Sequence, residues 1–365
     1  MNFILDKLKK DMNLDEIIKF LDQLELNYKI NDNLIIIKYP KKLKFSEHKY
    51  IRDTRGLIFD IKNKKIINRS FSGCISYNNF KNNIDWDNVV LEEFIDGTLI
   101  NLYYNEEWKL STKFCIDAKT SFYRSKKSYY DLFNEIYSLD NIDFDKKYTY
   151  SFVLVHNESR NISKISENKI YHIETTNNYT GEKINLDLGF TKPKILKIKN
   201  IINQYNLNSY TDLENFKFNS WNNPGFMIYN LDRTQRTVFK NKDFTEIENL
   251  IKGQKDFNFI FIKYLKNRPI IDKLLNVFPE YNELFKKIYN KFTSLILEIF
   301  DIYCNTKVYK TQKLVDRKFK KIIYDIHGIY LQKVKKEKKF KIALKDVYEL
   351  LLNYDSAYLY STYFN

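Results

Sequence analysis

The pattern of apolar and polar residues changes near residue 243. Before that point, short apolar runs such as Leu34-Ile35-Ile36-Ile37 alternate with turn residues, which is typical of β-strands. After that point, apolar residues recur three and four positions apart, as Leu284, Ile288 and Phe292 do, which is typical of helices. We therefore predict a mixed domain over residues 1–243 and an all-helical domain over residues 244–365.

Turn residues between the apolar runs place the individual elements. Asp96-Gly97 lies between apolar runs, and we expect a tight hairpin there because Gly accepts the positive φ of such turns. Other strands are expected within 26–39, on both sides of Asn63-Lys64, and at 147–155, 170–175, 183–184, 225–231 and 236–239. Helices are expected within 1–30, at 195–206, 212–216, 244–253, 257–265, 270–278, 281–303, 313–331 and 342–352.

Charge adds a prediction about the partner. The 365 residues include 61 basic and 46 acidic side chains, a formal net charge of +15. Lys and Arg gain free energy by releasing phosphate counterions, so the charge favours RNA or DNA as a partner. The alternative is codon bias, because Asn, Lys, Ile and Tyr are over-used as in AT-rich genomes.

Several classes of protein are excluded by absent patterns. No apolar run approaches the length that spans a membrane, and the first residues do not read as a signal peptide. The three cysteines have no CxxC spacing and fit reduced thiols in the cytoplasm. The four histidines do not cluster, and we treat His156 as a structural residue more readily than a pocket residue. We expect no membrane partner and no metal site.

Five motifs follow one another along the first domain. They are Thr54-Arg55-Gly56-Leu57-Ile58-Phe59, the strand and turn Leu91 to Ile100, Phe152 to Arg160, Pro224-Gly225-Phe226-Met227 and Phe239-Lys240-Asn241-Lys242. In this order and spacing the set resembles the nucleotidyltransferase domain of RNA ligases of the phage and fungal tRNA-ligase type. The resemblance covers about residues 30–243. It implies an α+β fold, with antiparallel sheets and flanking helices followed by a helical domain that helps to engage tRNA.

The departures from this family pattern fall on its catalytic positions. Phe94 stands where the family carries the lysine that accepts the nucleotide, and Phe has no nucleophile. Val153 and Pro224 stand where the family carries glutamates that serve the ribose or the metal step. Mg²⁺ binds through carboxylate and phosphate oxygens, which Val and Pro cannot supply. We therefore assign no catalytic residue and no certain cofactor, with ATP and Mg²⁺ expected only if the protein is active.

The cationic part of the family pattern is retained. The resemblance implies that Lys240 and Lys242 bind phosphate from one face of the last strand, where alternate residues share a face. The alternative for this pair is a solvated strand surface. The full set of nucleotide- or phosphate-binding candidates is Arg55, Asp96, Gly97, Lys113, Lys240 and Lys242.

The helical domain carries two basic clusters with Tyr324 and Tyr330 between them. Basic residues can follow a phosphate backbone while aromatic rings stack on bases, so this region is predicted to bind RNA. A solvated, lysine-rich surface is the alternative. The candidate RNA-binding residues are Arg317, Lys318, Lys320, Lys321, Lys335 and Lys336.

The predicted function is that of a catalytically inactive, RNA-ligase-like protein that binds RNA, with tRNA or its cut ends as the favoured class. One hypothesis is that it protects tRNA from a tRNA-cutting nuclease as an immunity factor. Two alternatives remain open: an active ATP-dependent RNA ligase with a non-standard nucleophile, and a structural subunit of a larger assembly.

Overall fold

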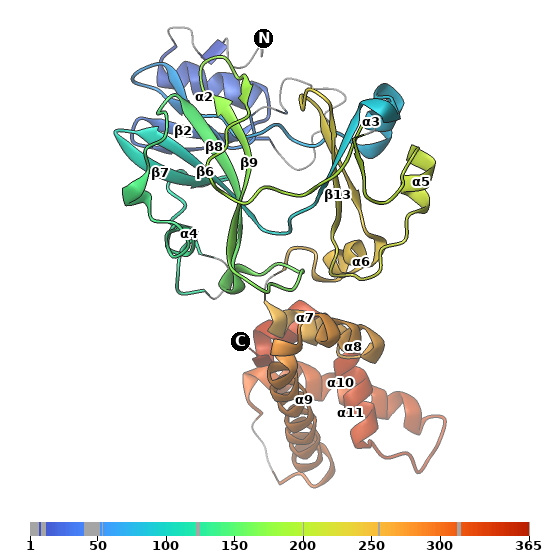
Figure 1. Ribbon diagram of the computed structural model, residues 1–365. Coiled ribbons are helices and arrows are strands. Elements are labelled where there is room, and N and C mark those ends of the chain that lie inside the picture. The colour runs from blue at the N-terminus through green and yellow to red at the C-terminus, as the bar shows by residue number, and fades with distance from the viewer. Residues whose placement is uncertain are drawn as a thin grey trace. The chain divides into compact units, whose positions relative to one another are not determined.

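The computed structural model describes residues 7–8, 12–39, 52, 54–121, 125–199, 201–254, 256–311 and 315–364 (Figure 1). The chain divides into two compact units, Met1–Glu246 and Ile247–Asn365. The predicted boundary after residue 243 lies close to this division, within helix α6 (Lys242–Ile251). Every described strand lies in the first unit and the second unit is helical, so the predicted α+β fold class is confirmed.

The first unit contains three antiparallel sheets. Their strand orders are β1-β2-β3-β4, β10-β9-β8-β6-β7 and β12-β11-β5-β13-β14, and we call them the first, second and third sheets. The strands of the first sheet are β1 (Asn27–Asn31), β2 (Leu34–Lys38), β3 (Leu57–Asp60) and β4 (Lys65–Asn68). Those of the second are β6 (Thr98–Asn105), β7 (Glu107–Thr112), β8 (Tyr148–Val155), β9 (Lys169–Asn177) and β10 (Lys183–Ile184). Those of the third are β5 (Val89–Glu93), β11 (Ile195–Ile198), β12 (Ile202–Asn203), β13 (Gly225–Asn230) and β14 (Arg236–Lys240).

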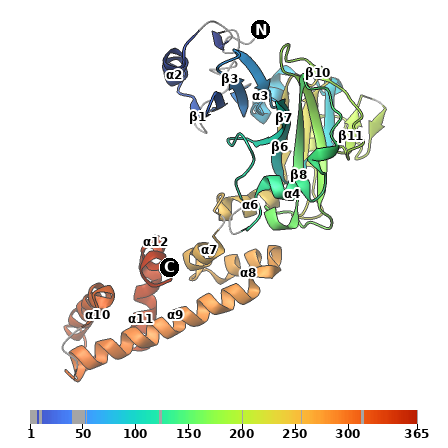
Figure 2. The same cartoon turned by 90° about the vertical axis from the view of Figure 1, so that its left-hand side faces the viewer.

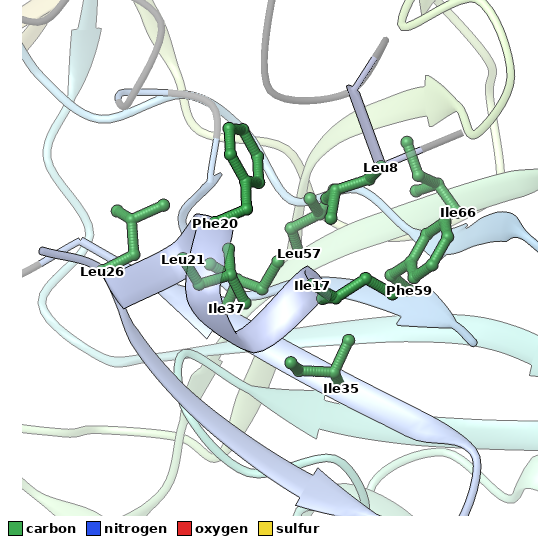
Figure 3. Packing of buried hydrophobic residues seen from close by; sticks show 10 residues of the cluster. All are labelled: Leu8, Ile17, Phe20, Leu21, Leu26, Ile35, Ile37, Leu57, Phe59 and Ile66. Carbon is green, nitrogen blue, oxygen red and sulfur yellow. The ribbon is translucent and has the colours of Figure 1, made fainter. Parts of the chain in front are cut away.

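Helix α2 (Leu14–Gln23) covers the first sheet. Asn13 and Glu16 form a capping box that satisfies free N–H groups at the start of this helix. Its apolar side chains pack onto alternate residues of β2 and β3, which point to one face of the sheet. Figure 3 shows this core, which comprises Leu8, Ile17, Phe20, Leu21, Leu26, Ile35, Ile37, Leu57, Phe59 and Ile66.

The second and third sheets each have one helix-covered face. Leu132 and Phe133 of α4 (Tyr129–Asn134) pack on the second sheet. Phe80 of α3 (Tyr77–Asn83) and Leu213 of α5 (Tyr210–Asn215) pack on the third. The two sheets form separate layers of the first unit (Figure 1), linked where Lys183 of β10 donates to the carbonyl oxygen of Arg233.

The predicted hairpin at Asp96-Gly97 is wrong. Strand β5 pairs with β11 and β13 in the third sheet, whereas β6 pairs with β7 and β8 in the second. The segment is therefore a crossover between sheets, and Gly97 does not have a positive φ. A Cβ atom on Gly97 would lie 2.5 Å from the carbonyl oxygen of Leu154, so close backbone approach is what requires glycine here.

Other element predictions had mixed outcomes. The helix expected at 195–206 is wrong, because β11 pairs with β5 and β12 pairs with β11. The strand pair β13 and β14 and the strands around Asn63-Lys64 are confirmed. The helix expected within 1–30 is the shorter α2, and residues 1–6 and 9–11 lie outside the described residues.

The second unit is built around α9 (Asn282–Tyr303), the long orange helix of Figure 2. Helices α10 and α11 pack against it, and its buried stripe includes Ile288, Phe292 and Ile296. The other helices are α7 (Phe257–Tyr264), α8 (Arg268–Val277), α10 (Arg317–Val334), α11 (Leu344–Asn353) and α12 (Ser356–Leu359). The six predicted helices after residue 243 all correspond to helices of the structure, and α12 was not predicted.

Candidate functional site

The three positions that depart from the ligase pattern lie around the crossover from β5 to β6. Phe94 follows β5, and its backbone N–H donates to the carbonyl oxygen of Gly225 at 3.2 Å. Pro224 directly precedes Gly225 and is buried. Val153 lies on β8, where its side chain is among the nearest neighbours that a Cβ on Gly97 would meet. These side chains supply neither an amine nor a carboxylate.

Asp96 has backbone partners. Its carboxylate accepts hydrogen bonds from the N–H groups of Ile162 and Ser163 at 3.0 and 2.9 Å. The Arg160 guanidinium donates to the carbonyl oxygens of the same two residues. Asp96 therefore connects the crossover between the sheets to the loop after β8.

Arg55 and Lys113 come together around Tyr39. The Lys113 Nζ lies 5.9 Å from the centre of the Tyr39 ring. Gly56 lies beside the Lys113 backbone, because a Cβ there would be in van der Waals contact with its carbonyl oxygen at 3.4 Å. Burial lowers the pKa of Arg55, Tyr39 opposes this shift, and the nearby charge of Arg236 lowers the pKa further. Two predicted cations thus share one neighbourhood.

Lys240 and Lys242 do not share a strand face, so that expectation is wrong. Lys240 is the last residue of β14 and pairs with Gly225, whereas Lys242 is the exposed first residue of α6. The buried Asn241 between them donates from its side chain to the carbonyl oxygens of Ser220 and Asn223. These bonds turn the chain out of the sheet, which leaves Lys240 beside the crossover.

The structure adds charged residues that the sequence interpretation missed. Glu92 accepts two hydrogen bonds from Arg233 at 2.6 and 3.0 Å, and Glu174 pairs with Lys183 at 2.9 Å. All four line a cavity of about 390 Å³ at the edges of the second and third sheets. Burial alone lowers the pKa of Arg233, but its hydrogen bonds to Glu92 raise it above the ordinary value. The alternation of side chains along a strand could have predicted which face of β5 Glu92 occupies. The ion pair with Arg233, however, depends on the fold.

These carboxylates do not fit a magnesium site of the family type. Glu92 and Glu174 are each neutralised by a cationic partner, so binding a metal would first require breaking an ion pair. Among the described residues, no group of three or more His, Cys, Asp or Glu side chains could hold a metal ion. The side chains of Val153 and Pro224 also supply no oxygen ligand for a magnesium ion.

His156 is held by hydrogen bonds on both ring nitrogens. The Nε2 atom lies 3.2 Å from Glu135 Oε2, and Nδ1 accepts from the backbone N–H of Glu158. The side chain is buried. This geometry supports the structural interpretation of His156. His48 lies outside the described residues.

The predicted RNA-binding residues are all exposed, but they lie on two kinds of structure. Arg317, Lys318, Lys320 and Lys321 lie in the first turns of α10. Lys335 and Lys336 follow the end of α10, so the second cluster is a loop rather than a helix face. Tyr324 is 79% exposed, whereas the ring of Tyr330 stacks on His327 at 5.7 Å. Tyr324 is thus the better placed of the two tyrosines for stacking on a base.

A second cavity, of about 640 Å³, lies at the other end of the second sheet. Asn105, Glu106 and Glu107, at the β6–β7 turn, contribute to its lining. None of the predicted site residues lines it. We therefore place the candidate site at the crossover, where Phe94 lies close to Gly225 and Lys240, while Arg55 and Lys113 lie around Tyr39.

Comparison with known proteins gives one match in sequence. No family model matches the chain. The chain is 25% identical over 287 residues to the "Putative bifunctional polynucleotide kinase/RNA ligase" of Autographa californica nuclear polyhedrosis virus. The chain is similar to an RNA ligase. The match includes 67% of this chain but only 40% of the viral protein, so the activity of the whole viral protein does not transfer directly.

Solved ligase structures are more distant. A Naegleria gruberi RNA ligase with PPi has 12% identity and a TM-score of 0.36, over 49% of this chain and 58% of that one. The "Putative ATP-dependent DNA ligase from Aquifex aeolicus" has 12% identity and a TM-score of 0.44, over 88% of this chain and 80% of that one. Similarity at this level carries no argument about function. Among the described residues, no helix is long and apolar enough to cross a membrane.

Proposed function

We propose that the protein is an RNA-ligase-like RNA-binding protein that holds RNA without forming a covalent nucleotide adduct. The observation that carries the proposal is Phe94, which stands at the family's lysine position and has no nucleophile. Arg55, Lys113 and Lys240 are the cations that the family pattern retains, and such side chains are suited to a phosphate. The similarity to a viral RNA ligase supports RNA as the partner.

The second unit supports the same proposal through its exposed charge. The cations of α10 and the following loop lie on the surface and can neutralise phosphates of a nucleic-acid backbone. We favour tRNA or its cut ends as the RNA, because the resemblance is to ligases of the tRNA-ligase type. The cytoplasm is the expected location.

Incubation with labelled ATP and Mg²⁺, followed by a denaturing gel, tests the inactive state. We expect no labelled protein, because a lysyl–nucleotide bond needs an amine at the position of Phe94. Phe94→Lys alone should also stay unlabelled, since Val153 and Pro224 supply no carboxylate. A genuine RNA ligase run in parallel controls for the reagents.

A labelled band from the unaltered chain would instead support the alternative, an active ATP-dependent ligase with a non-standard nucleophile. Peptide mapping of the adduct would then identify that nucleophile. RNA binding is measured separately on the same preparation. Absence of both labelling and RNA binding would favour the structural-subunit hypothesis.

Protection of tRNA is the finer hypothesis within this proposal. A protein that occupies the tRNA site attacked by a nuclease would confer immunity by competition. Cells that express the chain are challenged with an anticodon nuclease, beside a variant in which Arg55, Lys240 and Lys242 are changed to Ala. We expect protection by the unaltered chain and its loss in the variant. Lack of protection by the unaltered chain would remove the immunity hypothesis and leave RNA binding in place.

A further inference from the structure

The outer edge of strand β7 lies at the cavity of about 640 Å³ in the first unit. Among the described strands, β7 ends the second sheet, because β6 is the strand that pairs with it. Trp108 and Leu110 of β7 line the cavity. The β1–β2 and β3–β4 turns of the first sheet and part of the chain after β7 line it as well. The cavity is therefore bounded by a sheet edge and by connecting segments.

Backbone groups of β7 point toward the outer side of this edge. The N–H of Thr112 donates to the carbonyl oxygen of Cys115, which lies beyond β7, at 2.9 Å. Backbone groups of an antiparallel strand point to its two sides alternately, and the register with β6 is continuous from Thr112 to Glu107. Leu110 and Trp108 therefore also direct their N–H and C=O groups away from β6. Among the described strands, none pairs with these groups.

An open edge beside a cavity is suited to strand addition. An extended chain that joins a sheet edge gains main-chain hydrogen bonds, while its alternate side chains provide specificity. The ladder between β6 and β7 has no bulge that would turn the edge away, and the cavity volume falls within the range of about 300–1,000 Å³ that is common for ligand sites. Lys109 of β7 pairs with Glu107 of the same strand at 3.6 Å, so the strand has no net charge of its own.

The charges around the cavity indicate which kind of chain fits. The protein has a formal net charge of +15, yet the cavity lining contains five carboxylates and three lysines. Among the described residues, no group of acidic side chains could hold a metal ion, so these carboxylates are spread along the lining. They therefore suit a chain with several separate ammonium or guanidinium groups. The carboxylates belong to Asp32, Asp60, Glu106, Glu107 and Asp117.

Trp108 adds an aromatic surface to this acidic lining. Its half-buried ring is held by edge-on contacts with Tyr104 and Phe144, whose ring centres lie 5.4 and 6.3 Å from its own. The half-buried ring of Tyr130 lines the same cavity. Lysine and arginine side chains cover apolar surface with their stems, and their charged ends are attracted to aromatic rings. The lining thus combines the carboxylates and aromatic rings that basic side chains need.

We propose that the outer edge of β7 is a docking site for an extended segment of a partner protein that is rich in lysine or arginine. The segment adds a strand to the second sheet, and its main chain pairs with Trp108 and Leu110. Its basic side chains meet the carboxylates of the turns. The kind of partner follows from charge complementarity, because this acidic lining belongs to a basic protein. The inference goes beyond RNA binding, and none of the predicted site residues lines this cavity.

Peptide binding to the full chain tests the site. The probe is a short fluorescent peptide in which lysine and valine alternate, and we expect saturable binding by fluorescence anisotropy. A peptide with glutamate in place of lysine should not bind. Asp32→Asn combined with Glu106→Gln removes two exposed carboxylates from the lining and should weaken binding about three- to tenfold. Glu25→Gln combined with Glu182→Gln removes two exposed carboxylates elsewhere in the first unit and should leave the affinity unchanged.

N-methylation of the peptide separates strand addition from simple charge attraction. Methyl groups on one alternate set of amides remove the N–H groups that face β7, whereas methyl groups on the other set leave them in place. We expect one set to weaken binding at least about tenfold and the other to have little effect. In the complex, hydrogen exchange should slow at the amides of Trp108 and Leu110. The amide of Lys109 points to β6 and should exchange equally slowly with and without the peptide.

Three results would overturn the proposal. Equal effects of the two methylated peptides, with unchanged exchange at Trp108 and Leu110, would show that β7 accepts no strand. Displacement of the peptide by spermidine at the same concentration of positive charge would assign the cavity to small amines. Protection of Trp108 and Leu110 that rises with protein concentration in the absence of peptide would assign the edge to a second copy of the chain. None of these results bears on RNA binding, which is measured without the peptide.

Discussion

The cations of the two units lie in opposite environments. In the first unit, Arg236 is 2% exposed and fixed by Phe71 and Ser72, and Lys183 is paired with Glu174. In the second, Arg317 and Lys320 of α10 stand in solvent. Fixed, desolvated charges select a ligand by its geometry, whereas exposed charges attract any polyanion with a strength that depends on salt. For the proposed RNA partner, this contrast predicts that specificity depends on the first unit and that a large share of affinity depends on the second.

This comparison predicts that substitutions in the two units will have different effects. Changes in the first unit should appear mainly as reduced stability or reduced ligand preference, because its side chains are packed. Changes on the surface of α10 should appear as reduced RNA affinity with little change in stability. Each prediction below therefore pairs a change in one unit with a matched change in the other or on another surface.

The largest expected effect is the pH dependence that His172 gives to the first unit. Burial, with a smaller contribution from the charge of Lys192, lowers the pKa of His172 to about 4, although Glu174 and Asp187 oppose the shift. The unfolded chain takes up this proton near pH 6.5, before the folded chain does. The contribution of His172 to the free energy of unfolding is therefore fully present above pH 6.5. It is lost, by about 3 kcal/mol in all, as the pH falls toward 4.

Denaturant unfolding across this pH range measures the effect. His172→Gln should remove most of this slope, whatever its own stability at neutral pH. His327→Gln is the control in the second unit, where the less buried His327 should contribute a smaller slope. Equal slopes in the unaltered chain and His172→Gln would contradict the prediction.

The next effect concerns RNA affinity and the surface of α10. Changing Arg317, Lys320 and Lys321 to Gln removes three exposed cations. If each neutralises one phosphate, the affinity should fall on the order of 100-fold at physiological salt. The slope of log affinity against log salt should become shallower by about 0.7–0.9 for each phosphate that is no longer neutralised.

The control for this change lies on α9. Lys286, Lys287 and Lys291 are also exposed, and their change to Gln removes the same charge from another helix. Filter binding over a salt series and thermal melting are measured on both variants. An equal fall in affinity in both would mean that net charge, and not the surface of α10, attracts RNA.

A smaller effect is expected from two glycine substitutions. A Cβ on Gly97 would lie 2.5 Å from the Leu154 carbonyl oxygen and 2.6 Å from Val153 Cγ1, so Gly97→Ala should destabilise the first unit by about 1–3 kcal/mol. A Cβ on Gly328 of α10 meets nothing within 4 Å. Gly328→Ala should instead stabilise the second unit by up to about 1 kcal/mol through helix propensity. Denaturant unfolding of both variants checks the prediction, which is a lower unfolding free energy for Gly97→Ala and a higher one for Gly328→Ala.

Gly97 also marks what the sequence could and could not predict. The apolar runs on both sides of Asp96-Gly97 predicted two strands correctly. A hairpin was the natural local interpretation, but local sequence does not say which sheet each strand joins. The helix predicted at residues 195–206 was wrong for a related reason. The apolar spacing there is compatible with a helix, but β11 pairs with β5 in the third sheet. The helices of the second unit were predicted well because their periodicity is local.

The candidate site divides in the same way. Motif order supplied Phe94, Arg55, Lys113 and Lys240 as candidates. The fold brings Lys240 beside Gly225 and Phe94, and it brings Arg55 and Lys113 to Tyr39. Lys242 was misplaced because the turn made by Asn241 depends on the distant carbonyl oxygens of Ser220 and Asn223. Arg236 was missed because a single Arg after a turn has no local pattern, and only packing on Phe71 distinguishes it.

The smallest expected effect tests whether α10 also binds bases. Tyr324 is 79% exposed, and Gly328 lies one helical turn later, where it leaves open surface beside the ring. A base stacked on such a ring contributes about 1–3 kcal/mol. We expect Tyr324→Ala to weaken binding of single-stranded RNA by about 1 kcal/mol at high salt, where the lysine charges are screened. Tyr324→Phe should keep the affinity, because stacking needs the ring and not the hydroxyl. Tyr309→Ala removes another exposed tyrosine, 68% exposed, and should have no effect. Equal affinity of Tyr324→Ala and the unaltered chain would reduce α10 to a purely electrostatic surface and sharpen its contrast with the first unit.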